Sequence, residues 1–183
     1  MPSHTTDIAG LIVFEPKIWK DDRGYFYESY NQNTFEEAGI KANFVQDNES
    51  KSTYGVLRGL HYQLGEFAQA KLVRVAEGEV LDVAVDIREG SPTYGQSFSI
   101  VLNAENKKQL FIPRGFAHGF LVLSETAVFC YKCDNFYSKE NEGGLRFNDP
   151  ALNIDWQIDP SKMILSEKDK VNPMFGAHLK FVF

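Results

Sequence analysis

Apolar and polar side chains alternate most clearly between residues 79 and 88. The odd positions are apolar and most even positions are polar: Leu81, Val83, Val85 and Ile87 alternate with Asp82, Ala84, Asp86 and Arg88. A period of two is typical of a β-strand whose faces meet different environments. We expect the odd face to lie in the core. The even face is expected either to meet solvent or to line a polar cavity.

Shorter segments of the same kind recur about every ten residues from near the start of the chain to just beyond Tyr131, with turn residues between them. This spacing predicts an all-β sandwich or barrel. Short helices are expected at Asn33–Ala38, which opens with a capping-box pattern, and at Ser166–Lys170. Leu179–Phe183 is expected to dock as a strand. No domain boundary is evident, so residues 1–183 are expected to form one domain.

Composition narrows the functional classes. The chain has 183 residues, of which 43% are hydrophobic and 24% charged, as in ordinary soluble domains. Its net charge of −6 argues against a nucleic-acid partner. No apolar run approaches the roughly 20 residues that span a membrane, and no secretory signal is evident. We therefore expect a cytoplasmic protein without a membrane partner.

Two cysteines have the spacing of a redox or zinc motif. Cys130 and Cys133 lie three residues apart in a predicted strand, so their side chains should face opposite sides. This arrangement favours two buried thiols over a disulfide or a metal site. Free thiols also fit a reducing compartment.

The segment from Gly55 to Gln63 is the strongest candidate for the centre of a site. It reads as a strand that carries Arg58 and His61. In a regular strand these two side chains would face opposite sides. A bulge or kink near Gly59 would let both reach one cavity.

The remaining histidines give little support for a metal site. A metal-binding cupin would need a second histidine two residues after His61, where this chain has Gln63. His118 lies among glycines and is the only other internal histidine. We therefore expect no catalytic metal and no cofactor, and acid–base chemistry instead.

Several side chains are candidates for that chemistry. A neutral His61 could act as a general base, supported by Asp82, Asp86 or Asp169, between which the sequence alone does not choose. Lys71 is a candidate cation for a developing oxyanion. Tyr131 taken alone reads as a core tyrosine. Possible phosphate ligands, by charge and geometry, are Arg23, Arg58 and Arg74.

Long motifs in a fixed order give the chain a specific resemblance. They are Asp22-Arg-Gly-Tyr-Phe-Tyr-Glu28, Gln46-Asp-Asn48, Val56-Leu-Arg-Gly-Leu-His-Tyr-Gln63, Gln69-Ala-Lys-Leu-Val73, Asp82-Val-Ala-Val-Asp-Ile-Arg88, Ile112-Pro-Arg-Gly-Phe-Ala-His-Gly-Phe120 and Ser166-Glu-Lys-Asp169. With these motifs, nearly the whole chain resembles the dTDP-4-dehydrorhamnose 3,5-epimerase family. The resemblance implies a cupin-type double-stranded jelly roll with short peripheral helices. It also implies a metal- and cofactor-free isomerase that inverts C3 and C5 of dTDP-4-keto-6-deoxyglucose, on the route to dTDP-L-rhamnose.

The resemblance also implies individual roles. His61 matches the proton-abstracting base, Asp169 its carboxylate partner, Tyr131 the acid on the opposite face and Lys71 the group that steadies the enolate. The implied substrate-binding residues are Arg23, Phe26, Glu28, Gln46, Asn48, Arg58, His118, Tyr137, Glu142 and Lys168. Tyr137 matches an aromatic that stacks on thymine. The family is usually homodimeric with N-terminal strands exchanged, so Arg23, Phe26 and Glu28 are candidates to serve the partner's site.

Other readings remain open at this point. A related enzyme could invert only C3 or only C5, or could be a 3,4-ketoisomerase, although the presence of both His61 and Tyr131 favours the full epimerase. A cupin that only binds a sugar would make Lys71 and Tyr131 structural. A metal-dependent oxygenase is disfavoured by the missing histidines. Arg114, where many relatives carry an acidic residue, departs from the family pattern without touching the matched catalytic positions.

Overall fold

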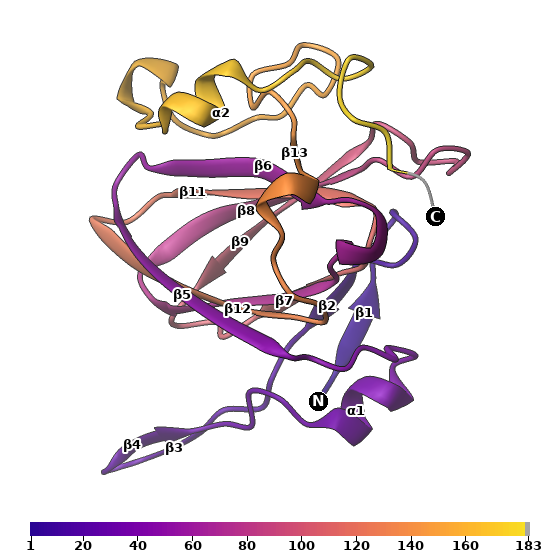
Figure 1. The fold of residues 1–183 in the computed structure, drawn as a ribbon. Helices are drawn as coiled ribbons and strands as arrows, with labels where there is room; N and C mark the ends of the chain where they lie inside the picture. The colour runs from indigo at the N-terminus through magenta and orange to yellow at the C-terminus, as the bar shows by residue number, and fades with distance from the viewer. Residues whose placement is uncertain (182–183) are drawn as a thin grey trace.

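The computed structural model describes residues 1–181 as two facing antiparallel sheets (Figure 1). The six-stranded sheet has the order β1 (Ser3–Thr5), β2 (Ile12–Phe14), β10 (Gln109–Ile112), β7 (Lys71–Glu77), β12 (Thr126–Cys133) and β5 (Gln46–Thr53). The five-stranded sheet has the order β13 (Glu142–Gly144), β6 (Leu57–Gln63), β11 (Phe116–Val122), β8 (Glu79–Asp86) and β9 (Ser97–Asn103). The chain passes repeatedly from one sheet to the other. This arrangement confirms the predicted all-β jelly roll.

A few short elements lie outside the sandwich. The hairpin β3 (Trp19–Asp21) and β4 (Gly24–Phe26) projects from it as a separate arm (Figure 1). The helices are α1 (Gln32–Glu37) and α2 (Glu167–Val171), with single 3₁₀ turns at Gly65–Phe67, Lys139–Asn141 and Pro160–Lys162. No helix in the described part of the chain has the length and apolarity to cross a bilayer.

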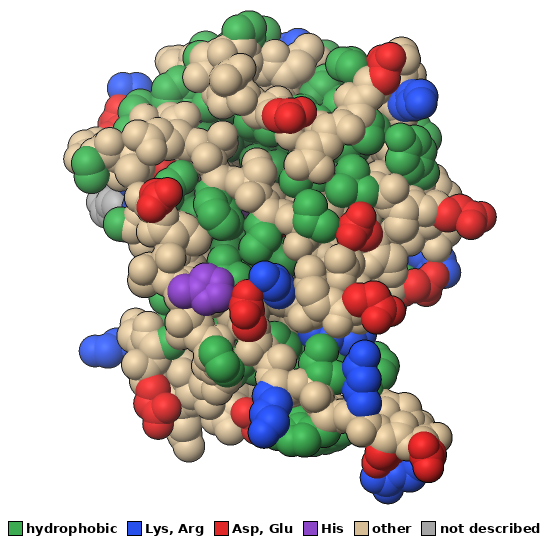
Figure 2. Space-filling view, turned by 180° about the vertical axis from the view of Figure 1, so that it is seen from behind, with side chains coloured by type: hydrophobic (Ala, Val, Ile, Leu, Met, Phe, Trp, Pro, Cys, Tyr) green, Lys and Arg blue, Asp and Glu red, His purple; other side chains and the backbone are tan. Residues whose placement is uncertain are grey.

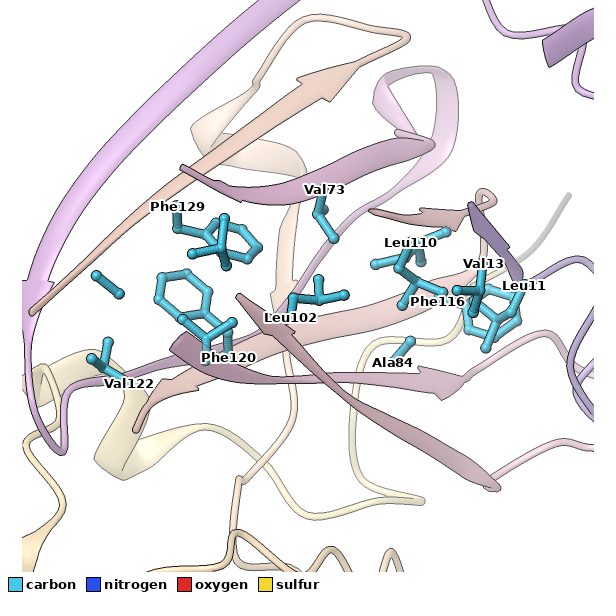
Figure 3. Packing of buried hydrophobic residues seen from close by; sticks show 14 of the residues in the cluster. Leu11, Val13, Val73, Ala84, Leu102, Leu110, Phe116, Phe120, Val122 and Phe129 are labelled. Carbon is cyan, nitrogen blue, oxygen red and sulfur yellow. The ribbon is translucent and has the colours of Figure 1, made fainter. Parts of the chain in front are cut away.

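Aromatic and aliphatic side chains from both sheets fill the space between them (Figure 3). Phe120 from β11 stacks on Phe129 from β12 with ring centroids 4.1 Å apart. Val73 and Leu110 extend this layer. Full burial of each such side chain contributes about 1.5–3 kcal/mol, so this layer holds the two sheets together.

Strand β8 is buried on both faces. Leu81, Val83 and Val85 point away from the other sheet and pack beneath the segment that follows β13, which explains why the odd positions are apolar. The even positions point between the sheets, where Ala84 joins the core and Asp82 is fully buried. The odd face is therefore core, as predicted, and the even face does not meet solvent.

Two boundary predictions need correction. Helix α1 begins one residue earlier than predicted, because the side chain of Asn31, rather than Asn33, accepts the backbone N–H groups of residues 33 and 34. At the other end of the chain, Phe181 forms an isolated parallel bridge with Arg88 instead of a strand. The rest of that predicted strand, residues 182–183, lies outside the described residues.

The predicted kink in β6 is confirmed. Opposite β11, Arg58 pairs with Phe120 and His61 pairs with His118, so three residue steps on β6 match two on β11. Gly59 lies within this bulge with φ of +136°, a conformation that essentially only glycine adopts. The extra residue brings Arg58 and His61 to the same cavity.

We predict that Gly59→Ala destabilises the fold more than Gly65→Ala. A Cβ at position 59 would lie 2.5 Å from the backbone of Gly119, whereas at position 65 nothing lies within 4 Å. Gly65 also has a positive φ, of +57°, but in the left-handed region that other residues can adopt, so the second variant shows the cost of a Cβ at positive φ without a steric contact. Urea denaturation should give a loss of about 1–2 kcal/mol for Gly65→Ala and a larger loss for Gly59→Ala. Equal losses would contradict the bulge geometry.

A second prediction concerns Asp86 at the end of β8. Burial raises the pKa of its carboxyl, but hydrogen bonds from Arg88, Ser91 and Thr93 outweigh this and lower it to about 2. The pKa of the unfolded state is higher, about 3.9, so the ionised group stabilises the fold above about pH 5 and loses this effect as the pH falls toward 2. The difference in unfolding free energy between the native protein and Asp86→Asn should shrink by about 1 kcal/mol between pH 7 and pH 3. A constant difference would contradict this.

Candidate active site

A cavity of about 440 Å³ opens between the two sheets at the kink in β6. A second hollow of about 250 Å³ adjoins it. His61, Lys71 and Tyr131 line both spaces and therefore mark where they meet. The first space is lined by apolar and polar side chains in about equal measure, Arg58 among the polar ones, and the second is lined mainly by polar side chains.

His61 contacts a carboxylate from a distant part of the chain. Its Nε2 lies 2.5 Å from Oδ1 of Asp169 on α2. Ser166 caps this helix and accepts the backbone N–H of Asp169, which fixes the position of the carboxylate. Burial raises the pKa of Asp169, but hydrogen bonds led by that of His61 outweigh it, so the pKa lies below its usual value. Asp169 is therefore ionised near neutral pH.

Tyr131 and Lys71 stand on the opposite wall of the cavity. Tyr131 comes from β12 and Lys71 from the neighbouring β7, with the Lys71 ammonium 5.8 Å from the centre of the Tyr131 ring. Burial raises the pKa of Tyr131, which keeps its hydroxyl protonated. Burial also lowers the pKa of Lys71, an effect that nearby acidic groups, including Asp82, oppose. The two walls thus carry different chemistry: imidazole on one, phenol and ammonium on the other.

His118 forms a second histidine–carboxylate pair beside the first. It lies directly across from His61 on β11, and its Nε2 is 2.9 Å from Oδ2 of Asp82. Burial lowers the pKa of His118, which favours the neutral ring. Of the three aspartates considered from sequence, Asp169 therefore contacts His61, Asp82 contacts His118, and Asp86 belongs to the separate network at the end of β8.

The adjoining polar hollow is lined by four of the remaining predicted binding residues. Gln46 and Asn48 lie two residues apart on β5, so both side chains face the hollow. The Gln46 amide donates a hydrogen bond of 3.0 Å to the Asn48 side-chain oxygen. Tyr137 donates to Glu142, 3.0 Å away, and Glu142 also pairs with Lys168 of α2. Arg58 lies in the first space, where its Nε donates to Ser52 at 3.1 Å.

The structure does not bring all predicted residues to this cavity. Arg23 and Phe26 lie on the projecting hairpin, where the Arg23 side chain is 90% exposed. Glu28 lies just beyond it and accepts a hydrogen bond from Asn31. Figure 2 shows this arm standing away from the body with charged side chains at its end. Arg74, a possible phosphate ligand by charge alone, lines a different pocket on the outer face of the sheet.

Two contributors to the site did not stand out in the sequence. The sequence places Ser166 in a short helix and in the motif that ends at Asp169 but gives it no role of its own, whereas in the structure its side chain accepts the backbone N–H of Asp169. Cys133 is buried, as expected, but it also lines the polar hollow, and burial raises the pKa of its thiol to about 11. The strand period offered the signal, since Cys133 shares a face with Tyr131. Cys130, predicted to be buried, is partly exposed on the other face.

The polar side chains of this region are of the kinds that transfer protons or bind anions. Within residues 1–181, no three His, Cys, Asp or Glu side chains gather in a way that could hold a metal ion. The site can remove a proton on one wall, supply one on the other, and stabilise negative charge between them.

Comparisons with known proteins identify the family of this chain. Residues 5–177 match the family described as dTDP-4-dehydrorhamnose 3,5-epimerase. A protein of that name from Shigella flexneri is 58% identical over 165 residues, which is 90% of each chain. The crystal structure of such an enzyme from Elizabethkingia anophelis is 59% identical, with a TM-score of 0.93 over 96% of this chain and 97% of that one.

A further structure contains a sugar nucleotide. The dTDP-6-deoxy-D-glucose-3,5-epimerase of Legionella pneumophila, solved in complex with dTDP-4-keto-L-rhamnose, is 50% identical. Its TM-score is 0.92 over 96% of this chain and 93% of that one. Matches of this extent and identity decide the assignment: this chain belongs to the dTDP-4-dehydrorhamnose 3,5-epimerase family.

Proposed function

We propose that the cavity inverts C3 and C5 of dTDP-4-keto-6-deoxy-D-glucose, giving dTDP-4-keto-L-rhamnose for the synthesis of dTDP-L-rhamnose. One observation carries the proposal: His61 and Tyr131 face one cavity from opposite sheets. Inversion at a carbon requires a proton to leave one face and another to arrive on the opposite face. Because C3 and C5 both flank the C4 ketone, one pair of groups can serve both carbons in turn.

His61 is proposed as the base, acting through Nδ1. The lowered pKa of Asp169 keeps it ionised, so its oxygen can only accept a hydrogen bond. The hydrogen between the two residues therefore belongs to Nε2 of His61. This leaves the lone pair on Nδ1 for the substrate, while the Asp169 carboxylate stabilises the imidazolium that forms.

Tyr131 and Lys71 are proposed to complete the reaction on the other wall. As the base removes a proton, negative charge develops on O4, and the Lys71 ammonium stabilises this enolate more than the ketone. The protonated Tyr131 hydroxyl then delivers its proton to the opposite face of the carbon. Burial of both groups in a poorly solvated space strengthens the electrostatic effect.

The remaining residues are proposed to hold the nucleotide. Within the same chain, Arg58 is proposed to bind the diphosphate and Tyr137 to stack on thymine. The other proposed contacts to the sugar nucleotide are made by Gln46, Asn48, His118, Glu142 and Lys168. Arg23, Phe26 and Glu28 are proposed to act in a second copy of the chain, as part of a homodimer with exchanged N-terminal strands. The exposure of Arg23 and Phe26 on a projecting arm supports this part of the proposal.

Proton NMR in deuterated water, with dTDP-4-keto-6-deoxyglucose as substrate, tests the reaction and the role of Tyr131. The native protein should introduce deuterium at both C3 and C5. Tyr131→Phe should still exchange protons through His61 but should form inverted product about 10²–10⁴-fold more slowly. Exchange at one carbon alone would indicate a single-site epimerase, and binding without exchange would contradict the proposed activity.

A contrast between His61→Ala and Asp169→Asn tests the base. Loss of the imidazole should lower turnover by about 10²–10⁴-fold. Asp169→Asn keeps the volume but removes the charge that stabilises the imidazolium, so turnover should fall by about 10–100-fold with little change in KM. Unchanged turnover in Asp169→Asn would reject its role as the partner of the base.

A further inference from the structure

The second strand of the projecting arm, β4, contacts a buried lysine from another part of the chain. Lys107 lies in the turn between β9 and β10 and is only 6% exposed. Its Nζ donates to the Tyr25 hydroxyl at 3.0 Å and lies 4.4 Å from the centre of the same ring. The ring of Tyr27 is 5.8 Å away. Two aromatic residues of the arm therefore surround one ammonium group.

The Lys107 ammonium is contacted by side chains of the arm. Among residues 1–181, no carboxylate lies within 4.0 Å of its ammonium, which instead contacts the Tyr25 hydroxyl and the rings of Tyr25 and Tyr27. A nearly buried ammonium without such partners is strongly unfavourable. Cation–π contacts with Tyr25 and Tyr27 offset that penalty, and more so where water is excluded. Movement of the arm away from the body would therefore remove the contacts of the Lys107 ammonium with Tyr25 and Tyr27.

The turn that presents Lys107 is itself fixed. Asn103 Oδ1 accepts the backbone N–H of Asn106 at 2.7 Å, and Asn106 Oδ1 accepts that of Lys108 at 2.9 Å. Two residues further on, the buried Gln109 donates to the backbone carbonyl of Ser29 at 2.7 Å. The segment Asn103–Gln109 therefore holds strand β4 through Tyr25 and the residues that follow it through Tyr27 and Ser29.

We propose that Lys107 is a positioning residue that aims the arm, so that Arg23 and Phe26 enter the cavity of a second copy of this chain. Lys107 itself touches no substrate. It acts in trans, by fixing the direction in which its own arm leaves the body. This inference rests on the exchange of arms in the proposed function.

Steady-state kinetics of Lys107→Met and Lys107→Arg provide the first test. Methionine keeps the length but loses the charge, so KM for the dTDP-sugar should rise about 3- to 30-fold while kcat stays unchanged. Arginine retains the cation and its stacking, and KM should stay near the native value. Tyr25→Leu, at a residue that is 58% exposed, should reproduce the methionine effect without loss of folding. A fall in kcat alone, or an unchanged KM in Lys107→Met, would overturn the proposal.

Subunit mixing tests whether the effect acts in trans. Hybrid dimers of one Lys107→Met chain and one His61→Ala chain can be purified through two different tags. Only the site of the Lys107→Met chain then keeps His61. That site receives the native arm of the His61→Ala chain, so its KM should return to the native value. If Lys107 acted within its own subunit, KM would stay raised, and the proposal would be wrong.

A parallel hybrid of Arg23→Ala and His61→Ala separates this inference from the function on which it rests. Recovery of the native KM there, but not in the Lys107 hybrid, would overturn the role of Lys107 while leaving arm exchange intact. Failure to recover in the Arg23 hybrid would overturn arm exchange itself, and with it the inference.

Discussion

The contact between His61 and Asp169 is the interaction on which the rest of the site depends. It joins residues that are 108 positions apart in the chain and connects the kinked strand β6 to helix α2. Without the bulge at Gly59, Arg58 and His61 would face opposite sides of the sheet. Without the cap at Ser166, the carboxylate would lack a fixed position. Local backbone geometry at two points therefore determines how the proposed base is oriented.

The two-sheet architecture supplies the other requirement of the reaction. A jelly roll places two walls across one interior space, and this chain sets a histidine–carboxylate pair on one wall and a tyrosine–lysine pair on the other. The core of Phe120 and Phe129 lies beside this space and keeps the walls apart. The same fold thus provides both stability and the opposite-face geometry that inversion demands.

The sequence supported much of this account. The alternation in β8 indicated a strand, and the Arg58–His61 spacing predicted the kink, because each rests on a local rule of backbone geometry. The choice of Asp169 over Asp82 and Asp86 could not be made from such rules, since it depends on how α2 docks across the sheet. Only the family resemblance selected Asp169.

Some features could be identified only from the folded structure. The contact between Lys107 and Tyr25 could not be predicted from the sequence, because more than 80 residues separate them. The sequence did not identify Asn31 as the N-cap of α1, because two nearby asparagines are both suitable N-cap residues. Contacts between distant segments are set by tertiary packing, which local propensity does not describe.

The most direct measurement of the central claim is ¹⁵N NMR of the His61 imidazole in the native protein near neutral pH. The account predicts a neutral ring with hydrogen on Nε2, facing Asp169, and an unprotonated Nδ1 facing the cavity. Asp169→Asn should weaken this tautomer preference. A native ring with hydrogen on Nδ1 and a bare Nε2 would contradict the account, because the base would then have no lone pair to offer the substrate.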